Sequence, residues 1–339
     1  MSKRRITPAL ADFGGADLLA SLGEDRGQFR NPHGLICAAN ESRFVSGHYS
    51  EQLTALTIGW KDAENLDALL DRLFPLVMVS RRFDFKKANN AEAFLSEVDD
   101  IRAIGQKQFK SVQYTGTEAT SKTLNKGLTI TIDHDQTDDL EAEVVASISR
   151  LQARLARNDL RRGFVLLDSL DTAGGNKEFD VDTNPDGFIR AMAVAAADVT
   201  GLYPNVFSIG EGAWHKRLDA YEGATRENGA GHAAWTPAQL AAYLMADVVE
   251  VVKARYQTSL TAKGNVNGAT NRIYAYLASQ GMSKDDPSAV KRFVSSSRGG
   301  GRWGVYRVEH EKCTDVSVEH YSNLVGTGIG VASIDAVTT

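Results

Sequence analysis

The stretch from Asp138 to Leu170 constrains the fold of this chain more than any other part of the sequence. Its large apolar residues recur at intervals of three and four, which is the spacing of one face of an α-helix. They are Leu140, Val144, Ile148, Leu151 and Leu155, followed after a five-residue step by Leu160, Phe164 and Leu167. A helix of roughly 33 residues would be about 50 Å long, several times the ordinary globular length. Such a rod needs packing partners along much of its length.

The two ends of this stretch carry charges that suit a helix. Asp138 is the predicted N-cap, and Glu141 stands where the second member of a capping box belongs. Acidic residues crowd the first turns and arginines fill the later ones, which matches the helix dipole. No proline interrupts the pattern. The sequence therefore predicts one long helix.

The composition is that of a globular protein with a sizeable core. The chain has 339 residues, of which 42% are hydrophobic and 24% charged, and its formal net charge is −5. An acidic chain lacks the basic surface that binds nucleic acid at large. No secretory signal and no run of about 18 apolar residues is present, so we expect a cytosolic protein or part of an assembly made in the cytosol.

The two cysteines, Cys37 and Cys313, lie far apart in the sequence. They form neither a metal-ligand spacing nor a disulfide framework, which fits a reducing compartment. A single long-range bridge between them stays open as an alternative.

The chain before the long helix is irregular. Residues 1–58 are punctuated by glycines and carry only scattered large residues, which favours an arm that lies on something else. A short amphipathic helix is predicted over 62–74 and a strand over 76–86, with Phe83 and Phe85 on one face.

Residues 87–127 are polar and have few apolar anchors. A structureless loop of that length is unusual in a compact domain, so we expect a projecting two-stranded ribbon that docks on a neighbour. Strand-like alternation places Phe109, Val112 and Tyr114 on this ribbon, and a strand follows over 128–133.

The chain after the long helix alternates between helix and strand patterns. Helices are predicted over 188–199, 213–221 and 236–245, the last capped by Thr236 with Pro237 at its first position. Strands are predicted over 204–210, 248–255, 269–279, 290–294, 302–308 and 315–321. Gly299, Gly300 and Gly301 would allow a tight loop between the predicted strands 290–294 and 302–308.

No motif in the sequence predicts an active site. Asp133 and Asp135 would face away from His134 in a strand, so a polar turn is favoured over a metal site. The glycine-rich segments do not match a phosphate loop, and no nucleophile elbow is present. We therefore assign no catalytic residue, no metal and no cofactor.

The arginines of the long helix share one face and could form a stripe for nucleic acid. They are Arg150, Arg154, Arg157 and Arg161. No aromatic residues are interleaved and acids precede them, so a solvated or subunit-contact face is favoured.

Three segments make the chain resemble the major capsid proteins of tailed bacteriophages, whose fold is shared with encapsulins. They are LNKGLTITIDHDQ at 124–136, YPNVFSIGEGAWHKR at 203–217, and YAYLASQGMSKDDPSAVKRFVS at 274–295. Together with the segments that follow them they span from about residue 120 to the C-terminus. They are packing and turn motifs, less specific than catalytic ones, but their order and spacing agree.

The resemblance implies an α+β fold with five parts. These are an N-terminal arm (1–75), an extended loop or E-loop with its base strands (76–134), a peripheral domain with the long spine helix (135–183), an axial α/β domain (184–301), and return strands with the C-terminus (302–339).

The function implied is that of a structural, non-enzymatic subunit of an icosahedral capsid, which forms pentamers and hexamers around double-stranded DNA. Implied partners are further copies of the chain, a separate scaffolding protein, a portal and a decoration protein. The location implied is the virion, after assembly in the host cytoplasm. Subunit contacts are predicted at Phe83, Phe85, Phe109, Val112, Tyr114, Arg154, Arg157, Arg161, Gly299, Gly300 and Gly301.

Two alternatives stay open. One is an encapsulin-like nanocompartment, which would enclose protein cargo and no DNA. The other is a cytosolic α/β enzyme with its site at 210–214, because that segment follows a predicted strand and opens a predicted helix.

Overall fold

The structure is a computed structural model that describes residues 65–87, 117–171, 174–180, 183–223, 229–259, 261–279, 284–297, 301–327 and 330–337. Its described residues form two compact units. The first unit holds those between 125 and 152 and between 296 and 320, and the second unit holds the rest. The five sequence-based domain boundaries stay predictions.

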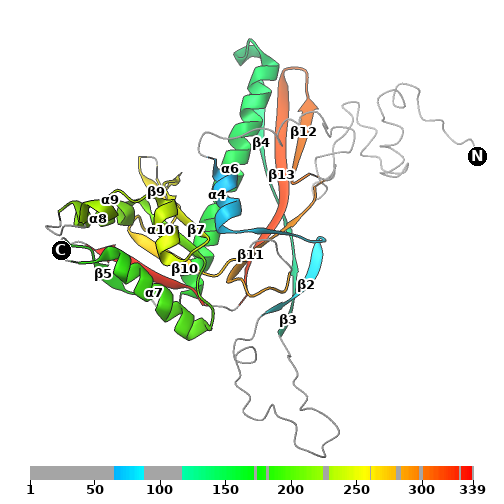
Figure 1. Ribbon diagram of the computed structural model, residues 1–339. Helices are drawn as coiled ribbons and strands as arrows, with labels where there is room; N and C mark the ends of the chain where they lie inside the picture. The colour runs from blue at the N-terminus through cyan, green and yellow to red at the C-terminus, as the bar shows by residue number, and fades with distance from the viewer. Residues whose placement is uncertain are drawn as a thin grey trace, which may run out of the picture. The chain divides into compact units, whose positions relative to one another are not determined.

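The described elements are named as in Figure 1. The helices are α4 (Leu66–Leu73), the 3₁₀ helix η3 (His134–Gln136), α6 (Leu140–Leu170), α7 (Pro185–Thr200), α8 (Glu211–Glu222), α9 (Gly229–Ala233) and α10 (Pro237–Leu244). The strands are β1 (Leu76–Met78), β2 (Arg82–Lys87), β3 (Thr117–Lys122), β4 (Leu124–Asp133), β5 (Asn176–Glu178), β6 (Val206–Gly210), β7 (Val248–Val252), β8 (Arg255–Gln257), β9 (Lys263–Asn265), β10 (Arg272–Tyr276), β11 (Val290–Ser295), β12 (Trp303–Glu309), β13 (Cys313–Gly326) and β14 (Ala332–Val337).

The predicted long helix is confirmed as α6, a single helix of 31 residues. Its predicted cap is wrong by one residue. The Asp139 carboxylate, and not that of Asp138, accepts the hydrogen bond of the Ala142 N–H at 3.1 Å. Ala142 therefore occupies the third helical position, so Glu141 does not complete a capping box.

The first unit is built on antiparallel strands. β12 pairs with the first part of β13, from Trp303 opposite His320 to Glu309 opposite Thr314, and β4 also pairs with β13. Inside this unit the Tyr306 hydroxyl donates to the buried Glu319 carboxylate at 2.6 Å. The polar turn predicted before the long helix is the 3₁₀ helix η3, whose His134 N–H donates to the Lys312 carbonyl at 3.0 Å.

The second unit contains a mixed five-stranded sheet in the order β5-β14-β10-β6-β7. Strand β6 runs parallel to β7 and antiparallel to β10, and β14 runs antiparallel to β10. Alternate residues of β10 serve two cores, as strand geometry requires. Ile273 and Ala275 belong to the core with α7 and α10, whereas Tyr274 and Tyr276 belong to the core with α4 and the later turns of α6.

The second unit also holds β1, β2, β3 and β11. β1 runs parallel to β11, and β11 runs antiparallel to the last part of β13. The predicted strand over 76–86 is thus two strands, because Val79–Arg81 break it. The strand predicted over 248–255 likewise ends at Val252, and β14 was not predicted at all.

Candidate subunit-contact site

The strand pair β2–β3 is the base of the predicted ribbon. It runs antiparallel from Arg82 opposite Lys122 to Lys87 opposite Thr117. The chain between its free ends, residues 88–116, lies outside the described residues, and so do the predicted contacts Phe109, Val112 and Tyr114. The described pair is where the predicted ribbon would start, and both the ribbon and its contacts stay predictions.

Aromatic packing holds this base to β11 within the second unit. Phe83 and Phe85 alternate with polar residues, so both rings lie on one face of β2. The ring centroids of Phe83 and Phe85 lie 4.3 Å and 5.4 Å from that of Phe293 on β11. Both rings are buried within the chain, which leaves little of either side chain for a neighbouring subunit.

Polar contacts fix the point where β3 passes into β4. The Thr123 N–H donates to the Arg81 carbonyl at 3.0 Å, and the hydroxyl oxygens of Thr123 and Ser295 lie 2.9 Å apart. The Arg81 guanidinium lies 4.4 Å from the centroid of the Tyr321 ring. The base of the strand pair is therefore anchored on both of its strands.

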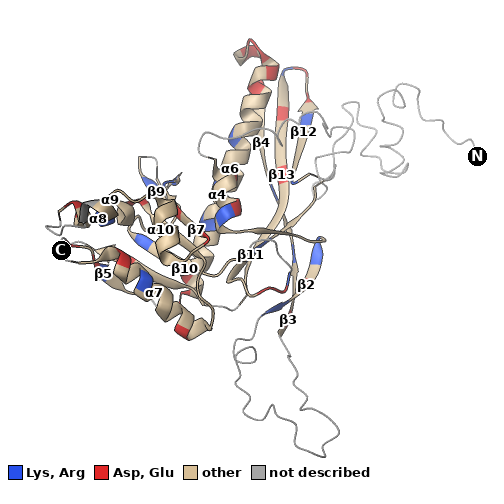
Figure 2. Cartoon of the chain, in the orientation of Figure 1, with Lys and Arg blue, Asp and Glu red and all other residues tan. Residues whose placement is uncertain are grey.

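The predicted arginine contacts on α6 have different surroundings. Arg154 is exposed and Arg157 is half-buried. The Arg161 guanidinium lies 4.2 Å from the centroid of the Tyr256 ring, so a cation–π contact inside the chain already uses it. Acidic side chains gather at the start of α6 (Figure 2), in keeping with the helix dipole.

Of the three predicted glycines, only Gly301 is described. Its carbonyl accepts hydrogen bonds from both the backbone N–H and the hydroxyl of Ser297, each at 2.8 Å. The chain between β11 and β12 is therefore closed tightly at its base. A contact role for these glycines stays a prediction.

A buried ion pair in the α/β section was missed by sequence reasoning. The Arg217 guanidinium donates to both carboxylate oxygens of Asp186, at 2.6 Å and 3.0 Å, and also to the His232 carbonyl at 3.0 Å. Burial raises the pKa of the neighbouring Tyr221 hydroxyl, and the charge of Asp186 adds to the rise. The pair ties α7 to α8, but Asp186 and Arg217 are 31 residues apart and no spacing pattern links them.

The alternative enzyme site at 210–214 is filled by the chain itself. A Cβ on Gly210 would lie 2.2 Å from the Thr270 carbonyl oxygen. The same oxygen accepts a hydrogen bond from the Ala213 N–H at 3.1 Å, which uses a donor at the start of α8. Among the described residues, no three His, Cys, Asp or Glu side chains gather to hold a metal ion.

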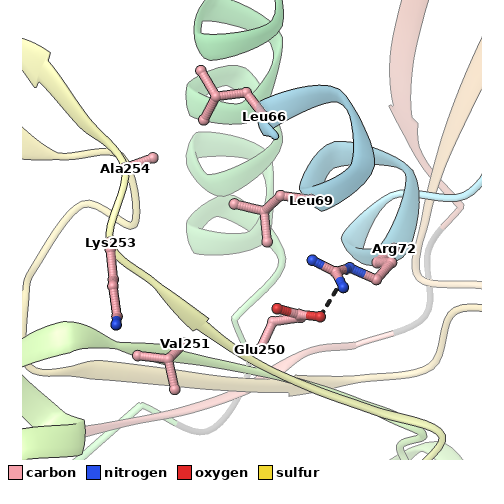
Figure 3. Close-up of a pocket in the computed structure, with 7 residues that line it drawn as sticks. All are labelled: Leu66, Leu69, Arg72, Glu250, Val251, Lys253 and Ala254. Atoms are coloured by element: carbon pink, nitrogen blue, oxygen red, sulfur yellow. Dashed lines mark ion pairs between the residues drawn. The ribbon is translucent and has the colours of Figure 1, made fainter. Parts of the chain in front are cut away.

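A shallow groove of about 310 Å³ lies between α4 and β7. Leu66, Leu69 and Val251 contribute apolar walls, and the Arg72 guanidinium pairs with the Glu250 carboxylate at 2.9 Å (Figure 3). Burial raises the pKa of Glu250, and the charge of Arg72 offsets part of that rise. The Lys253 side chain also lines the groove (Figure 3).

No described helix is both long and apolar enough to span a membrane. Cys313, in the described part, carries a free thiol.

The ribbon base, the long helix and the α/β section together define the class of fold. It is the mixed α+β fold of the tailed-phage capsid type, as the sequence predicted. One solved structure that supports this is a phage-related protein from Bordetella bronchiseptica. It matches 84% of this chain and 96% of its own, with a TM-score of 0.60 and 16% identity.

Weaker likenesses have TM-scores below 0.5. The mature capsid of bacteriophage PhiM1 matches with a TM-score of 0.46 and 10% identity, over 79% of this chain and 86% of that one. An encapsulin complex from Synechococcus elongatus matches with a TM-score of 0.43 and 10% identity, over 85% of this chain and 96% of that one. No family model and no curated protein matches the sequence.

Proposed function

We propose that this chain is a structural subunit of an icosahedral virus capsid, built from pentamers and hexamers around double-stranded DNA. The observation that carries the proposal is the fold, which extends over 84% of the chain in the likeness to a phage-related protein. The proposed location is the virion, after assembly in the host cytoplasm. A scaffolding protein, a portal and a decoration protein are proposed as partners.

The β2–β3 pair supports a role in assembly. An isolated two-stranded ribbon is marginally stable in water, so a long one gains stability only against a partner. Here the base is anchored by Phe293 and Ser295, while the strands lead away from the core into residues 88–116. We propose that this segment contacts a neighbouring subunit.

The net charge of −5 suits a container for DNA. A basic inner surface would adsorb DNA strongly by releasing counterions, and would oppose the movement of DNA during packaging. An acidic subunit avoids this affinity.

Electron microscopy of the purified protein tests the proposal directly. We expect closed shells or capsomer rings, and nuclease-protected double-stranded DNA in particles from infected or induced cells. Shells that hold a protein cargo and no protected DNA would favour the encapsulin-like alternative. A compact monomer under all assembly conditions would refute the capsid function.

A hairpin variant separates folding from assembly. Lys87 lies opposite Thr117, so residues 88–116 can be replaced by a two-residue Asn-Gly turn that suits an antiparallel pair. We expect this variant to unfold like the wild type, because Phe83 and Phe85 keep their partner Phe293, but to form no shells. Shells of normal size from this variant would refute the contact role of the segment.

A further inference from the structure

Met245, directly after α10, combines exposure with an unfavourable backbone conformation. Its exposed fraction of 75% is the highest among the large hydrophobic residues that the structure describes as exposed. Its φ of 54° and ψ of 37° are left-handed, where glycine is the usual residue. A single exposed apolar side chain is ordinary, but the conformation of this one calls for a reason.

The turn itself requires the left-handed conformation. The Ala246 N–H donates to the Ala241 carbonyl at 2.9 Å and the Met245 N–H to the Ala242 carbonyl at 3.3 Å, which is the Schellman pattern of a helix end. Glycine would satisfy this pattern without steric strain. The methionine side chain therefore adds nothing to the turn, and its exposure leaves it free to contact another molecule.

An apolar face that such a side chain would fit lies on α7. The outward positions of this helix include Ala191, Val194, Ala195 and Val199, and both valines are exposed. Exposed Asp198 ends this apolar face beside Val199. The alanines leave room between the valines for an unbranched side chain.

The charges beside the two features are complementary. Exposed Arg190 stands one turn before Val194 on α7, and exposed Asp247 stands two residues after Met245. Within the described residues, Arg190 makes no ion pair, although its guanidinium lies 5.8 Å from the centroid of the Tyr243 ring. The Asp247 carboxylate accepts from the neutral Asn205 amide at 2.8 Å. A second copy therefore offers an apolar side chain for the valines and alanines of α7 and a carboxylate for Arg190.

We infer that Met245 of one copy seats on the α7 face of a second copy, between Ala191, Val194 and Ala195, with Asp247 of the first copy beside Arg190 of the second. The inference rests on the proposed function, since it names one of the contacts that join subunits. Methionine suits this role because its flexible, polarizable side chain fills irregular apolar hollows.

Disulfide trapping between separately labelled copies tests the contact. Met245→Cys and Val194→Cys are made as separate variants, each in a Cys37→Ser/Cys313→Ser background, and are assembled alone or as an equal mixture under mild oxidation. We expect disulfide-linked dimers on non-reducing gels only from the mixture. Val165→Cys, at an exposed position on α6, replaces Met245→Cys in the control mixture and should give at least tenfold less dimer.

Each other outcome of the trapping is informative. Dimers from Val194→Cys alone would mean that α7 pairs with α7, which overturns the inference. Assembled particles without the mixed disulfide would overturn the inference and leave the capsid function standing. A protein that stays monomeric would overturn both.

Met245→Gly separates a contact role from a structural one. Because glycine suits the left-handed turn, this variant should keep or raise the midpoint of thermal unfolding of the unassembled subunit. The same variant should raise the protein concentration needed for half-maximal assembly by about tenfold. A lowered midpoint with unchanged assembly would show that the side chain serves the fold, and would overturn the inference.

Discussion

Gly163, in the middle of α6, offers a substitution whose sign distinguishes packing from helix propensity. Propensity predicts that Gly163→Ala stabilises the protein by about 1 kcal/mol, because glycine loses more conformational freedom in a helix. The structure predicts the opposite. A Cβ at this position would lie 2.5 Å from Cε2 and 2.6 Å from Cζ of the Phe74 ring.

The Phe74 ring has little room to move. It is fully buried, and its centroid lies 5.8 Å from that of Phe164 and 6.2 Å from that of Tyr276. Carbon atoms normally approach to about 3.5 Å, so the ring or the helix would shift by about 1 Å. Overpacking of this kind costs about 1–3 kcal/mol. With the propensity gain set against a cost near the upper end, we expect a net loss of about 2 kcal/mol.

Urea unfolding of the unassembled subunit, followed by tryptophan fluorescence, measures this loss. Gly231→Ala is the matched control, since Gly231 is also helical but a Cβ there would have no neighbour within 4 Å. The control should be neutral or stabilising by up to about 1 kcal/mol.

A second substitution tests the cause. Phe74→Leu removes the ring that the new Cβ of Gly163→Ala meets. The free energy of unfolding lost in the double variant should therefore be smaller, by about 1–2 kcal/mol, than the sum of the losses in the two single variants. Stabilisation by Gly163→Ala alone, of the size seen for Gly231→Ala, would refute the packing argument.

Three further predictions concern the ribbon base, the buried ion pair and the groove. Phe293→Ala should lower the free energy of unfolding by about 3–5 kcal/mol in a urea titration, because the ring is fully buried between Phe83 and Phe85. Val165→Ala, at an exposed position, should change the same free energy by less than about 0.5 kcal/mol. Asp186→Asn should lower the free energy of unfolding by about 3–5 kcal/mol, because it leaves the Arg217 charge buried and unpaired. Replacing both partners by apolar residues should give a smaller loss, measured by thermal melts at the same pH. Burial raises the folded-state pKa of Glu250, so the wild-type protein loses stability as its carboxyl ionises above about pH 4.3. Glu250→Gln should therefore become more stable relative to the wild type as the pH rises. A difference in urea titrations that does not change with pH would contradict this.

The sequence predicted the elements that carry their own local signals. The apolar repeat of α6 located the helix to within two residues at its start, because period, charge order and the absence of proline agree. The Thr236 cap was also correct, and the structure adds its reciprocal partner Gln239, whose side chain accepts from the Thr236 N–H at 2.8 Å. The error at Asp138 arises because two adjacent aspartates offer the same capping chemistry.

Elements that depend on distant partners were not predicted. β14 lies in a glycine-punctuated tail and is specified by its pairing with β10, for example Ile334 opposite Ile273. The Asp186–Arg217 pair likewise depends on the packing of α7 against α8. Neither leaves a period or a spacing in the sequence, so no local pattern could reveal them.

Apolar residues that are buried within a chain and those buried between chains look the same in a sequence. Phe83 and Phe85 were predicted as contacts because they alternate along a ribbon, yet Phe293 of the same chain covers them. Met245 and Val194 were not predicted, because one outward apolar residue hardly alters a helical pattern dominated by its buried face. Two observations distinguish a residue that contacts another copy from one buried within its own chain. They are a large exposed fraction in the single chain and a left-handed backbone conformation that would suit glycine better. At Met245 both are present, so the proposed contact between copies is sought there first, and a contact role for Phe83 and Phe85 stays a prediction.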